Sequence, residues 1–176
     1  MRNIVLTGFM GTGKSSVGKH LAARLALTFV DMDAVIEERA GKPIARIFAE
    51  DGEQHFRNLE RQLVQELAAR QGLVIATGGG VVLNPENIRD LSRSGLVVCL
   101  SASPSEILRR VAHETHRPLL QADDKEARII ALLEARRKLY AAIPVQIDTT
   151  NLSVEQVADQ IAALYAKESP TTGEAR

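Results

Sequence analysis

Short apolar runs alternate with amphipathic segments along most of the chain. The runs are apolar throughout rather than alternating with polar residues, a pattern typical of strands in a parallel sheet that is covered on both faces. The predicted strands are 4–7, 27–30, 73–76, 96–100 and 145–147. The segments between them repeat apolar residues at helical spacing and predict helices over 14–25, 34–39, 43–48, 53–70, from Pro85 onward, and over 103–111, 124–140 and 153–167. The pattern predicts an α/β fold in three layers, with helices flanking a five-stranded parallel sheet.

Length and composition favour a single globular domain. A chain of 176 residues is close to the usual size of one domain. Its 45% apolar and 25% charged residues, with a mean hydropathy of −0.07, exclude a disordered, collagenous or coiled-coil chain. The last residues, 169–176, are polar and have no apolar stripe. We therefore expect one domain over 1–168, followed by a flexible tail.

Charge balance and rare residue types narrow the range of partners. Lys and Arg (22) equal Asp and Glu (22), which argues against a broad nucleic-acid surface, and only 3% of the residues are aromatic. The one cysteine, Cys99, lies in the apolar run 96–100, so we expect a buried, inert thiol and no disulfide. No apolar stretch approaches the ~20 residues of a membrane span, and the first run reaches Gly8 too early for a signal peptide. These features predict a cytoplasmic protein with neither nucleic acid nor membrane as a partner.

A phosphate-binding motif joins the first predicted strand to the first predicted helix. The residues Gly8-Phe9-Met10-Gly11-Thr12-Gly13-Lys14-Ser15 match the P-loop pattern G-x-x-x-x-G-K-[ST]. Glycines let the backbone wrap phosphate oxygens, and the helix N-terminus adds positive potential. Lys14 should reach the β- and γ-phosphates of a nucleoside triphosphate, and the Ser15 hydroxyl should bind Mg²⁺. The alternative is an ordinary glycine-rich turn, but the motif in this context favours the nucleotide.

Two carboxylates follow the second predicted strand. Asp31 and Asp33 are two residues apart, so in an extended chain their side chains face the same side. They would project from the carboxyl end of the strand, where α/β proteins bind ligands, and could hold Mg²⁺ and orient an acceptor hydroxyl. The alternative is that Asp33 only caps a helix that begins at Ala34.

Three further features are candidates for an acceptor site. Gly78-Gly79-Gly80 offers bare backbone that a ligand can approach closely, or forms only a sharp turn. Arg136 shares a helix face with apolar residues, so its guanidinium needs a ligand anion or an internal ion pair, unless the side chain extends to solvent. Arg57, four residues after Glu53 and three before Glu60, is by itself typical of a surface ion pair.

The segment 113–124 has no strong period and is predicted to be a loop between two helices. A loop of this length in a compact domain is usually a lid or disordered. Arg117, near its middle, could contact a transferring phosphoryl group or simply face solvent.

In their order along the chain, these motifs resemble shikimate kinase, a family of P-loop kinases of the nucleoside monophosphate kinase type. The resemblance covers about 3–164. Besides the P-loop it rests on Asp31-Met32-Asp33, the segment 53–60, Ala76-Thr77-Gly78-Gly79-Gly80, Arg117-Pro118-Leu119-Leu120, and Arg136 four residues before Tyr140. It implies a sheet in the order 2-3-1-4-5 and ATP-dependent phosphorylation of the 3-hydroxyl of shikimate, in the pathway to chorismate and the aromatic amino acids. It further implies ATP and shikimate as partners and Mg²⁺ as cofactor, and we expect a monomer.

The resemblance also implies roles for individual residues. The implied catalytic residues are Asp33, as base or orienter of the acceptor hydroxyl, Lys14, and Arg117, which would close from a lid over about 112–124. The implied ATP-binding residues are Gly11, Thr12, Gly13, Lys14, Ser15, Ser16, Arg110, which would stack on adenine, and Arg117. The implied shikimate-binding residues are Asp33, Phe48, Phe56, Arg57, Gly78, Gly79, Gly80 and Arg136. Ser15 would bind Mg²⁺ directly and Asp31 through water, while Glu60 would position Arg57.

The chain departs from the family pattern at two places, and two other functions remain open. Thr149-Thr150-Asn151-Leu152-Ser153 lacks the proline that the family often has before the last helix, which leaves the adenine contacts open. A second proline, often found before the tyrosine, is missing from Lys138-Leu139-Tyr140. The alternatives are a related small-metabolite kinase, such as a gluconate kinase, and a nucleotide-binding module without turnover. The Asp31-Met32-Asp33 motif with the triple glycine favours shikimate.

Overall fold

The sheet that positions the site has five strands, all parallel. The computed structural model describes residues 1–112 and 125–168. Within them the strands are β1 (Asn3–Gly8), β2 (Thr28–Asp31), β3 (Leu73–Ala76), β4 (Gly95–Ser101) and β5 (Val145–Asp148). They lie in the order β2-β3-β1-β4-β5, and every pairing is parallel. The predicted fold class and the strand order implied by the resemblance are confirmed.

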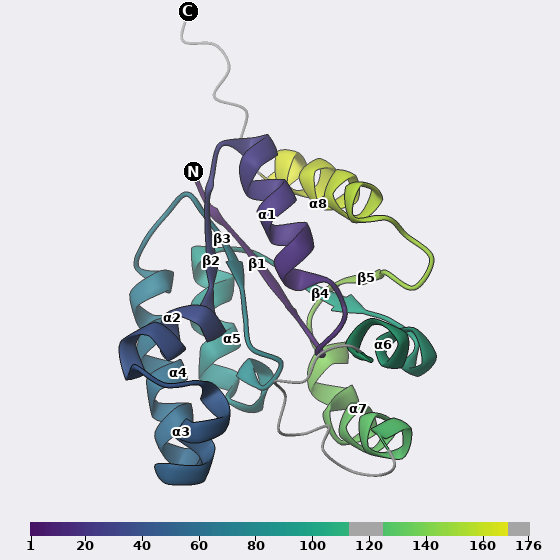
Figure 1. Cartoon of the computed structure of the whole chain (residues 1–176). Helices are drawn as coiled ribbons and strands as arrows, with labels where there is room; N and C mark the ends of the chain where they lie inside the picture. The colour runs from purple at the N-terminus through teal and green to yellow at the C-terminus, as the bar shows by residue number, and fades with distance from the viewer. Residues whose placement is uncertain (113–124, 169–176) are drawn as a thin grey trace, which may run out of the picture.

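Helices cover both faces of this sheet. One face carries α1 (Lys14–Leu25) and α8 (Val154–Glu168), which lie side by side (Figure 1). The other face carries α2 (Met32–Ala40), α3 (Ile44–Glu50), α4 (Glu53–Ala68), the short turn η1 (Val81–Leu83), α5 (Pro85–Ser94), α6 (Pro104–Val111) and α7 (Lys125–Ala141). Because neighbouring residues of a strand face opposite sides, β1 supplies two cores: Val5 packs with the second group of helices, and Ile4 and Leu6 pack with α1 and α8.

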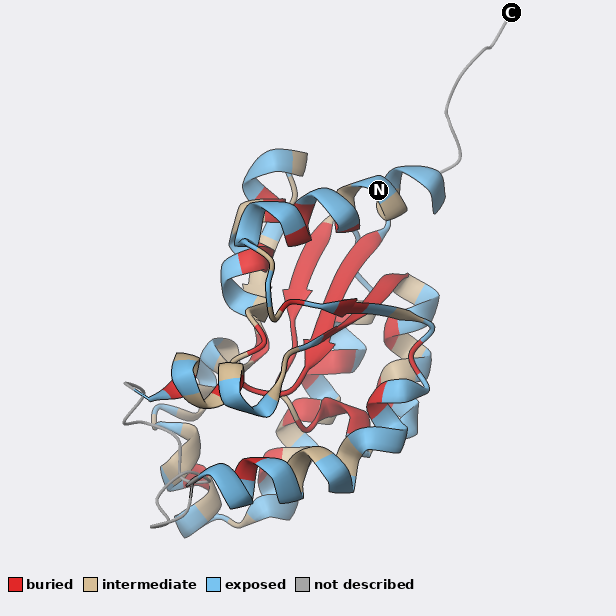
Figure 2. Ribbon diagram, turned by 90° about the vertical axis from the view of Figure 1, so that its right-hand side faces the viewer, coloured by how far each residue is buried: buried red, intermediate tan, exposed pale blue. Residues whose placement is uncertain are grey.

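Burial of the strands depends on their place in the sheet. β1 and β3 are buried along their whole length, and β4 is buried as far as Leu100 (Figure 2). β2 and β5 form the two edges, where a neighbouring strand covers one side only. They keep exposed residues, among them Thr28, Gln146 and Asp148. The prediction that helices cover both faces is confirmed, and the edge strands are only partly buried: Phe29 and Val30 of β2 still pack against opposite cores.

Local chemistry fixes where α2 begins. The bounds of α1 and β3 are as predicted, but α2 begins at Met32, two residues earlier than the pattern indicates. The reason is that the Asp31 side chain accepts hydrogen bonds from the N–H groups of Asp33 and Ala34, which makes Asp31 the cap of the helix. The alternative that Asp33 caps a helix beginning at Ala34 is therefore wrong.

The structure tests the predictions of a buried thiol and of a chain without a membrane span. Cys99 is buried on β4, as predicted, and burial raises the pKa of its thiol to about 11. The thiol is therefore protonated at neutral pH and is a poor nucleophile.

Across 1–112 and 125–168, no helix is long and apolar enough to cross a membrane. The predicted lid residues 113–124, with Arg117, and the predicted tail 169–176 lie outside the described residues.

Candidate active site

A cleft of about 520 Å³ opens at the carboxyl ends of β1, β2 and β3. Parallel strands end at the same edge of the sheet, so the segments that follow them meet there. The cleft is lined by Gly11, Gly13, Lys14, Ser15, Ser16, Asp31, Asp33, Ala34, Glu37, Thr77, Gly79 and Arg110. It therefore brings together the P-loop, the two aspartates, part of the glycine run and Arg110, which lie far apart in the sequence.

The P-loop depends on glycines and on the Lys14 side chain. Gly11 and Gly13 have φ angles of 74° and 95°, a left-handed conformation that disfavours residues with a side chain. Lys14 Nζ donates hydrogen bonds to the carbonyl oxygens of Gly8 (2.9 Å) and Phe9 (2.8 Å). The ammonium group is thus held over the loop at the N-terminus of α1, where the helix dipole also favours an anion. The arrangement suits a bound phosphate group, which would replace the two carbonyls as the hydrogen-bond partner of the ammonium group.

Asp31 links the P-loop helix to α2. Its Oδ2 accepts a hydrogen bond of 2.7 Å from the Ser15 hydroxyl, while its Oδ1 accepts from the Asp33 N–H at 3.1 Å. A hydroxyl and a carboxylate oxygen are hard ligands of the kind that Mg²⁺ prefers. The described part of the chain holds no group of three or more His, Cys, Asp or Glu side chains that could bind a metal ion by themselves. A cation at Ser15 and Asp31 would therefore complete its shell with phosphate oxygens and water.

Asp33 lies in the first turn of α2 and faces the glycine run. A Cβ atom on Gly78 would lie 2.8 Å from Asp33 Oδ1 and 3.2 Å from Glu60 Oε1. Because Gly78 has no side chain, both carboxylates can lie close to its backbone. Asp31 and Asp33 line the same cleft as predicted, although they lie on a strand end and a helix rather than on one extended segment.

Arg57 is held in place on α4 by its neighbours. Its Nη1 donates to Glu60 Oε2 at 2.9 Å and its Nη2 donates to Glu53 Oε1 at 3.2 Å. Its guanidinium lies over the Phe56 ring and fills the space that a side chain on Gly80 would need. Only 21% of the side chain is exposed, so Arg57 is more than the surface ion-pair residue that its spacing indicates.

Glu60 is the buried partner in this group, with 2% of its surface exposed. Burial raises the pKa of its carboxyl group, and the positive charges of Arg57 and Arg136 oppose that shift. Its Oε2 accepts from Arg57, whereas its Oε1 accepts no hydrogen bond from the described residues. A buried carboxylate that binds Arg57 in this way fixes the direction of the guanidinium.

α7 brings Arg136 and Tyr140 to the same glycine run. Arg136 Nη1 would lie 3.8 Å from a Cβ atom on Gly79, and the Tyr140 hydroxyl donates a hydrogen bond of 2.6 Å to the Gly79 carbonyl. Burial raises the pKa of Tyr140, while the Arg136 guanidinium opposes that shift through its charge and a hydrogen bond. Arg57 and Arg136 thus approach adjacent glycines, from α4 and α7.

Phe48 and Phe56 form a small aromatic pair beside Arg57. Their ring centroids are 4.9 Å apart and the rings are tilted by 41°. Phe56 is buried in the core and Phe48 packs against it partly exposed. The role of these two residues as a wall of the acceptor site stays a prediction.

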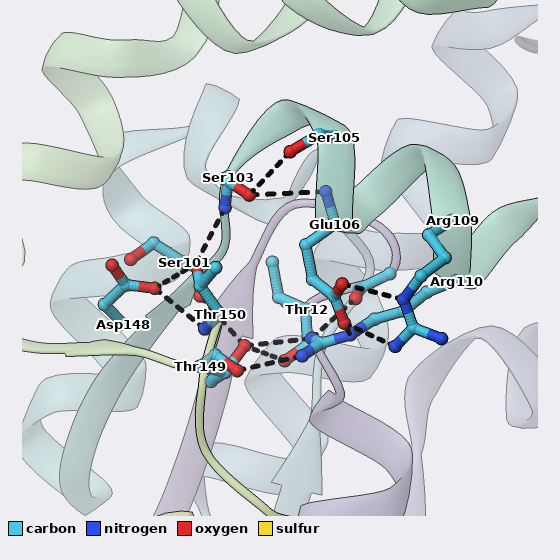
Figure 3. A network of polar contacts seen from close by, with 11 residues as sticks. Thr12, Ser101, Ser103, Ser105, Glu106, Arg109, Arg110, Asp148, Thr149 and Thr150 are labelled. Carbon is cyan, nitrogen blue, oxygen red and sulfur yellow. Dashed lines mark hydrogen bonds and ion pairs between the residues drawn. The ribbon is translucent and has the colours of Figure 1, made fainter.

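Arg110 reaches the cleft from α6 and is held by three segments (Figure 3). Its Nε donates to Glu106 at 2.7 Å, its Nη1 to the Gly11 carbonyl at 3.1 Å, and its Nη2 to the Thr149 carbonyl at 2.8 Å. Its predicted stacking on adenine and the predicted contact of Arg117 with phosphate are not tested by this arrangement. Arg117 lies outside the described residues.

Three residues that line the cleft or bind residues lining it have no role in the sequence analysis. Thr77 lines it directly after β3, and its buried hydroxyl has no hydrogen-bond partner among the described residues. Thr149 follows β5 in the same way, and Tyr140 is noted only for its spacing from Arg136. The rule that residues directly after parallel strands lie near the ligand site would have found both threonines. No local signal indicates that the Tyr140 hydroxyl binds the glycine run.

Known proteins resemble this chain along almost its whole length. A family model described as shikimate kinase matches residues 10–166. A shikimate kinase from Pelotomaculum thermopropionicum is 48% identical over 161 residues, which cover 92% of this chain and 94% of the relative. The structure of a shikimate kinase from Acinetobacter baumannii in complex with shikimate has a TM-score of 0.91 and 36% identity, covering 97% of this chain and 96% of that one.

A gluconokinase from Sinorhizobium meliloti is a more distant neighbour. Its structure has a TM-score of 0.59 and 21% identity, and the match covers 94% of each chain. Similarity at this level shows a common fold and nothing finer. The sequence identity, the coverage and the family model instead agree on one assignment: the chain belongs to the shikimate kinase family.

Proposed function

We propose that this protein transfers the γ-phosphoryl group of ATP to the 3-hydroxyl of shikimate and releases ADP and shikimate 3-phosphate. The observation that carries the proposal is the position of the glycine run beside the P-loop. Gly78 lies against the Asp33 and Glu60 carboxylates, Gly80 lies against the Arg57 guanidinium, and Gly79 lines the cleft. In an acceptor that carries a hydroxyl and a carboxylate, the hydroxyl could bind to the Asp33 carboxylate and the acceptor carboxylate to a guanidinium.

The P-loop side of the cleft would hold the triphosphate. N–H groups of Gly11, Thr12, Gly13 and Ser16 would contact phosphate oxygens, as would the ammonium group of Lys14. Lys14 would move from the Gly8 and Phe9 carbonyls to the β- and γ-phosphates and neutralise the charge that spreads over them during transfer.

The pair of Ser15 and Asp31 fits a magnesium ion that arrives with ATP. Ser15 Oγ would be a direct ligand, and Asp31 would act through water from its place beside Ser15. Bound there, Mg²⁺ would neutralise phosphate oxygens and fix the geometry of the triphosphate.

The other side of the cleft would hold the acceptor. Asp33 would accept a hydrogen bond from the 3-hydroxyl and take its proton as the oxygen attacks the γ-phosphorus in line. Arg57 and Arg136 would bind the shikimate carboxylate, with Glu60 holding Arg57 in place and N–H groups of the glycine run adding contacts. Catalysis would come from positioning and charge neutralisation.

The remaining assignments rest on the family resemblance. They are Phe48 and Phe56 as walls for the shikimate ring, Arg110 as a stacking partner of adenine, and Arg117 as a lid residue that contacts the phosphates. We also propose that 1–168 fold as one domain and that the protein acts as a cytoplasmic monomer. Its pathway would be that of chorismate and the aromatic amino acids.

A coupled assay of ADP release tests the proposed function directly. Purified protein is supplied with ATP, Mg²⁺ and either shikimate or gluconate, and the product is identified by mass. Shikimate-dependent ADP release with a shikimate 3-phosphate product is the expected result. Release that depends on gluconate would favour the related kinase, and nucleotide binding without release would favour a module without turnover.

Removing the Tyr140 hydroxyl should weaken the binding of shikimate without affecting the binding of ATP. Tyr140→Phe keeps the packed ring but loses the 2.6 Å hydrogen bond to the Gly79 carbonyl. We expect the KM for shikimate to rise about three- to tenfold, because one hydrogen bond is worth about 1 kcal/mol, while the KM for ATP is unchanged. Steady-state kinetics with each substrate varied in turn measure both constants.

Tyr165 provides the matched control for this substitution. It lies on α8, away from the cleft, and its hydroxyl donates a hydrogen bond of 2.7 Å to the Arg2 carbonyl. Tyr165→Phe should leave both KM values unchanged. Equal changes in the two variants, or a shikimate KM that Tyr140→Phe does not move, would show that Tyr140 serves packing only.

A further inference from the structure

Thr149 lies directly after β5, at the point where three segments of the chain meet (Figure 3). It is 2% exposed. Its Oγ1 lies 3.1 Å from the Thr12 carbonyl of the P-loop and 3.0 Å from the Ser101 carbonyl at the end of β4. It also accepts a hydrogen bond of 3.0 Å from Arg110 Nη1. A hydroxyl carries one proton, so Thr149 donates to one carbonyl at a time while it accepts from Arg110.

Arg110 extends this contact along the P-loop. The same Nη1 donates to the Gly11 carbonyl at 3.1 Å, and Nη2 donates to the Thr149 carbonyl at 2.8 Å. Thr149 therefore binds Arg110 through both its hydroxyl and its backbone. Together the two residues hold the carbonyl groups of Gly11 and Thr12, two successive peptide units of the phosphate-binding loop.

Holding these carbonyls also fixes the N–H groups of the next residues. A trans peptide is planar, and its C=O and N–H groups point in opposite directions. The carbonyl of Thr12 belongs to the same peptide as the N–H of Gly13, and the carbonyl of Gly11 to the same peptide as the N–H of Thr12. Since Thr149 and Arg110 hold the carbonyls from one side, the N–H groups point away from them. Gly11 and Gly13 line the cleft.

We propose that Thr149 is a positioning residue of the nucleotide site: its hydroxyl holds the Thr12–Gly13 peptide and the Arg110 guanidinium so that the loop is ready to bind phosphate. This inference rests on the proposed function, because it assumes that the cleft binds ATP. It does not depend on the identity of the acceptor. Nucleotide binding measured without any acceptor therefore separates it from the assignment of shikimate.

The test compares two neighbouring threonines. Thr149→Val keeps the shape of the side chain and removes the hydroxyl, and should raise the Kd for ATP with Mg²⁺, measured by calorimetry, about tenfold. The KM for ATP should rise in parallel and the KM for shikimate should not change. Thr149→Ser restores the hydroxyl and should bring the Kd back close to its original value.

Thr150 supplies the control, because its hydroxyl forms hydrogen bonds beside Thr149 but none to the P-loop or Arg110. It donates to Asp148 Oδ1 at 2.5 Å and accepts from the Ser103 N–H at 3.0 Å. Thr150→Val should leave the Kd for ATP unchanged. If the valine variant at 149 does not fold, Thr149→Ala takes its place with the same expectation.

Three results would overturn the proposal. The first is a folded Thr149→Val or Thr149→Ala protein whose Kd for ATP is unchanged. The second is an equal rise in the KM for shikimate, which would indicate a general loss of structure. The third is an equal effect of Thr150→Val, which would assign the effect to the whole segment rather than to the Thr149 hydroxyl.

Discussion

Replacing Lys14 with alanine should lower kcat by about a hundred- to a thousandfold while the protein stays folded. The lysine supplies the charge that faces the β- and γ-phosphates, and removal of one such electrostatic group from an active site costs about 10²- to 10³-fold. In the absence of nucleotide its ammonium group binds the carbonyls of Gly8 and Phe9, so the substitution also removes two local hydrogen bonds. A thermal melt beside the kinetics separates lost chemistry from lost stability.

Two further lysine variants sharpen this test. Lys14→Met keeps most of the side-chain length without the charge and should be as inactive as Lys14→Ala. Lys19→Ala removes an exposed lysine from the same helix, α1, and should leave kcat unchanged. A folded Lys14 variant with near-normal turnover would contradict the assignment of the P-loop as the ATP site.

The fold could be predicted from the sequence where its signals are local. Apolar runs of β1, β3 and β4 and the bounds of α1 follow from patterns within a few residues. The P-loop is equally local, because its glycines and Lys14 act through the backbone of one turn. The sequence also predicts the two edge strands to within one residue, but not how exposed they are, since the exposure of Gln146 depends on β5 having a neighbour on one side only.

The candidate site depends on contacts between distant segments, and the sequence alone could indicate only part of it. The spacing of Arg57 from Glu53 and Glu60 predicts an ion pair, but not that the guanidinium packs against Gly80 or that Glu60 is buried. The hydrogen bond between Tyr140 and Gly79 joins residues 61 positions apart. Contacts of this kind are fixed by how α4, α7 and the glycine run pack, which no local pattern records.

Arg136→Ala should raise the KM for shikimate by tens- to a hundredfold and leave the KM for ATP nearly unchanged. The Arg136 guanidinium approaches Gly79 from α7, and the Arg57 guanidinium lies against the adjacent Gly80. The charge of Arg136 also acts on Glu60 and Tyr140. Loss of a charge-assisted contact with a carboxylate costs about 2–3 kcal/mol, which corresponds to this change in KM.

The neighbouring Arg137 makes the comparison for Arg136 specific. It lies one position further along α7, its side chain is 71% exposed, and it pairs with Glu134 at 3.3 Å on the outer surface. Arg137→Ala should leave both KM values unchanged, because an exposed pair of this kind contributes little. If Arg136→Ala raises the KM for ATP as much as the KM for shikimate, or if both alanine variants behave alike, Arg136 is not a ligand of the acceptor carboxylate. A selective rise in the KM for shikimate is expected instead, since Arg136 approaches the glycine run whereas Arg137 pairs with Glu134.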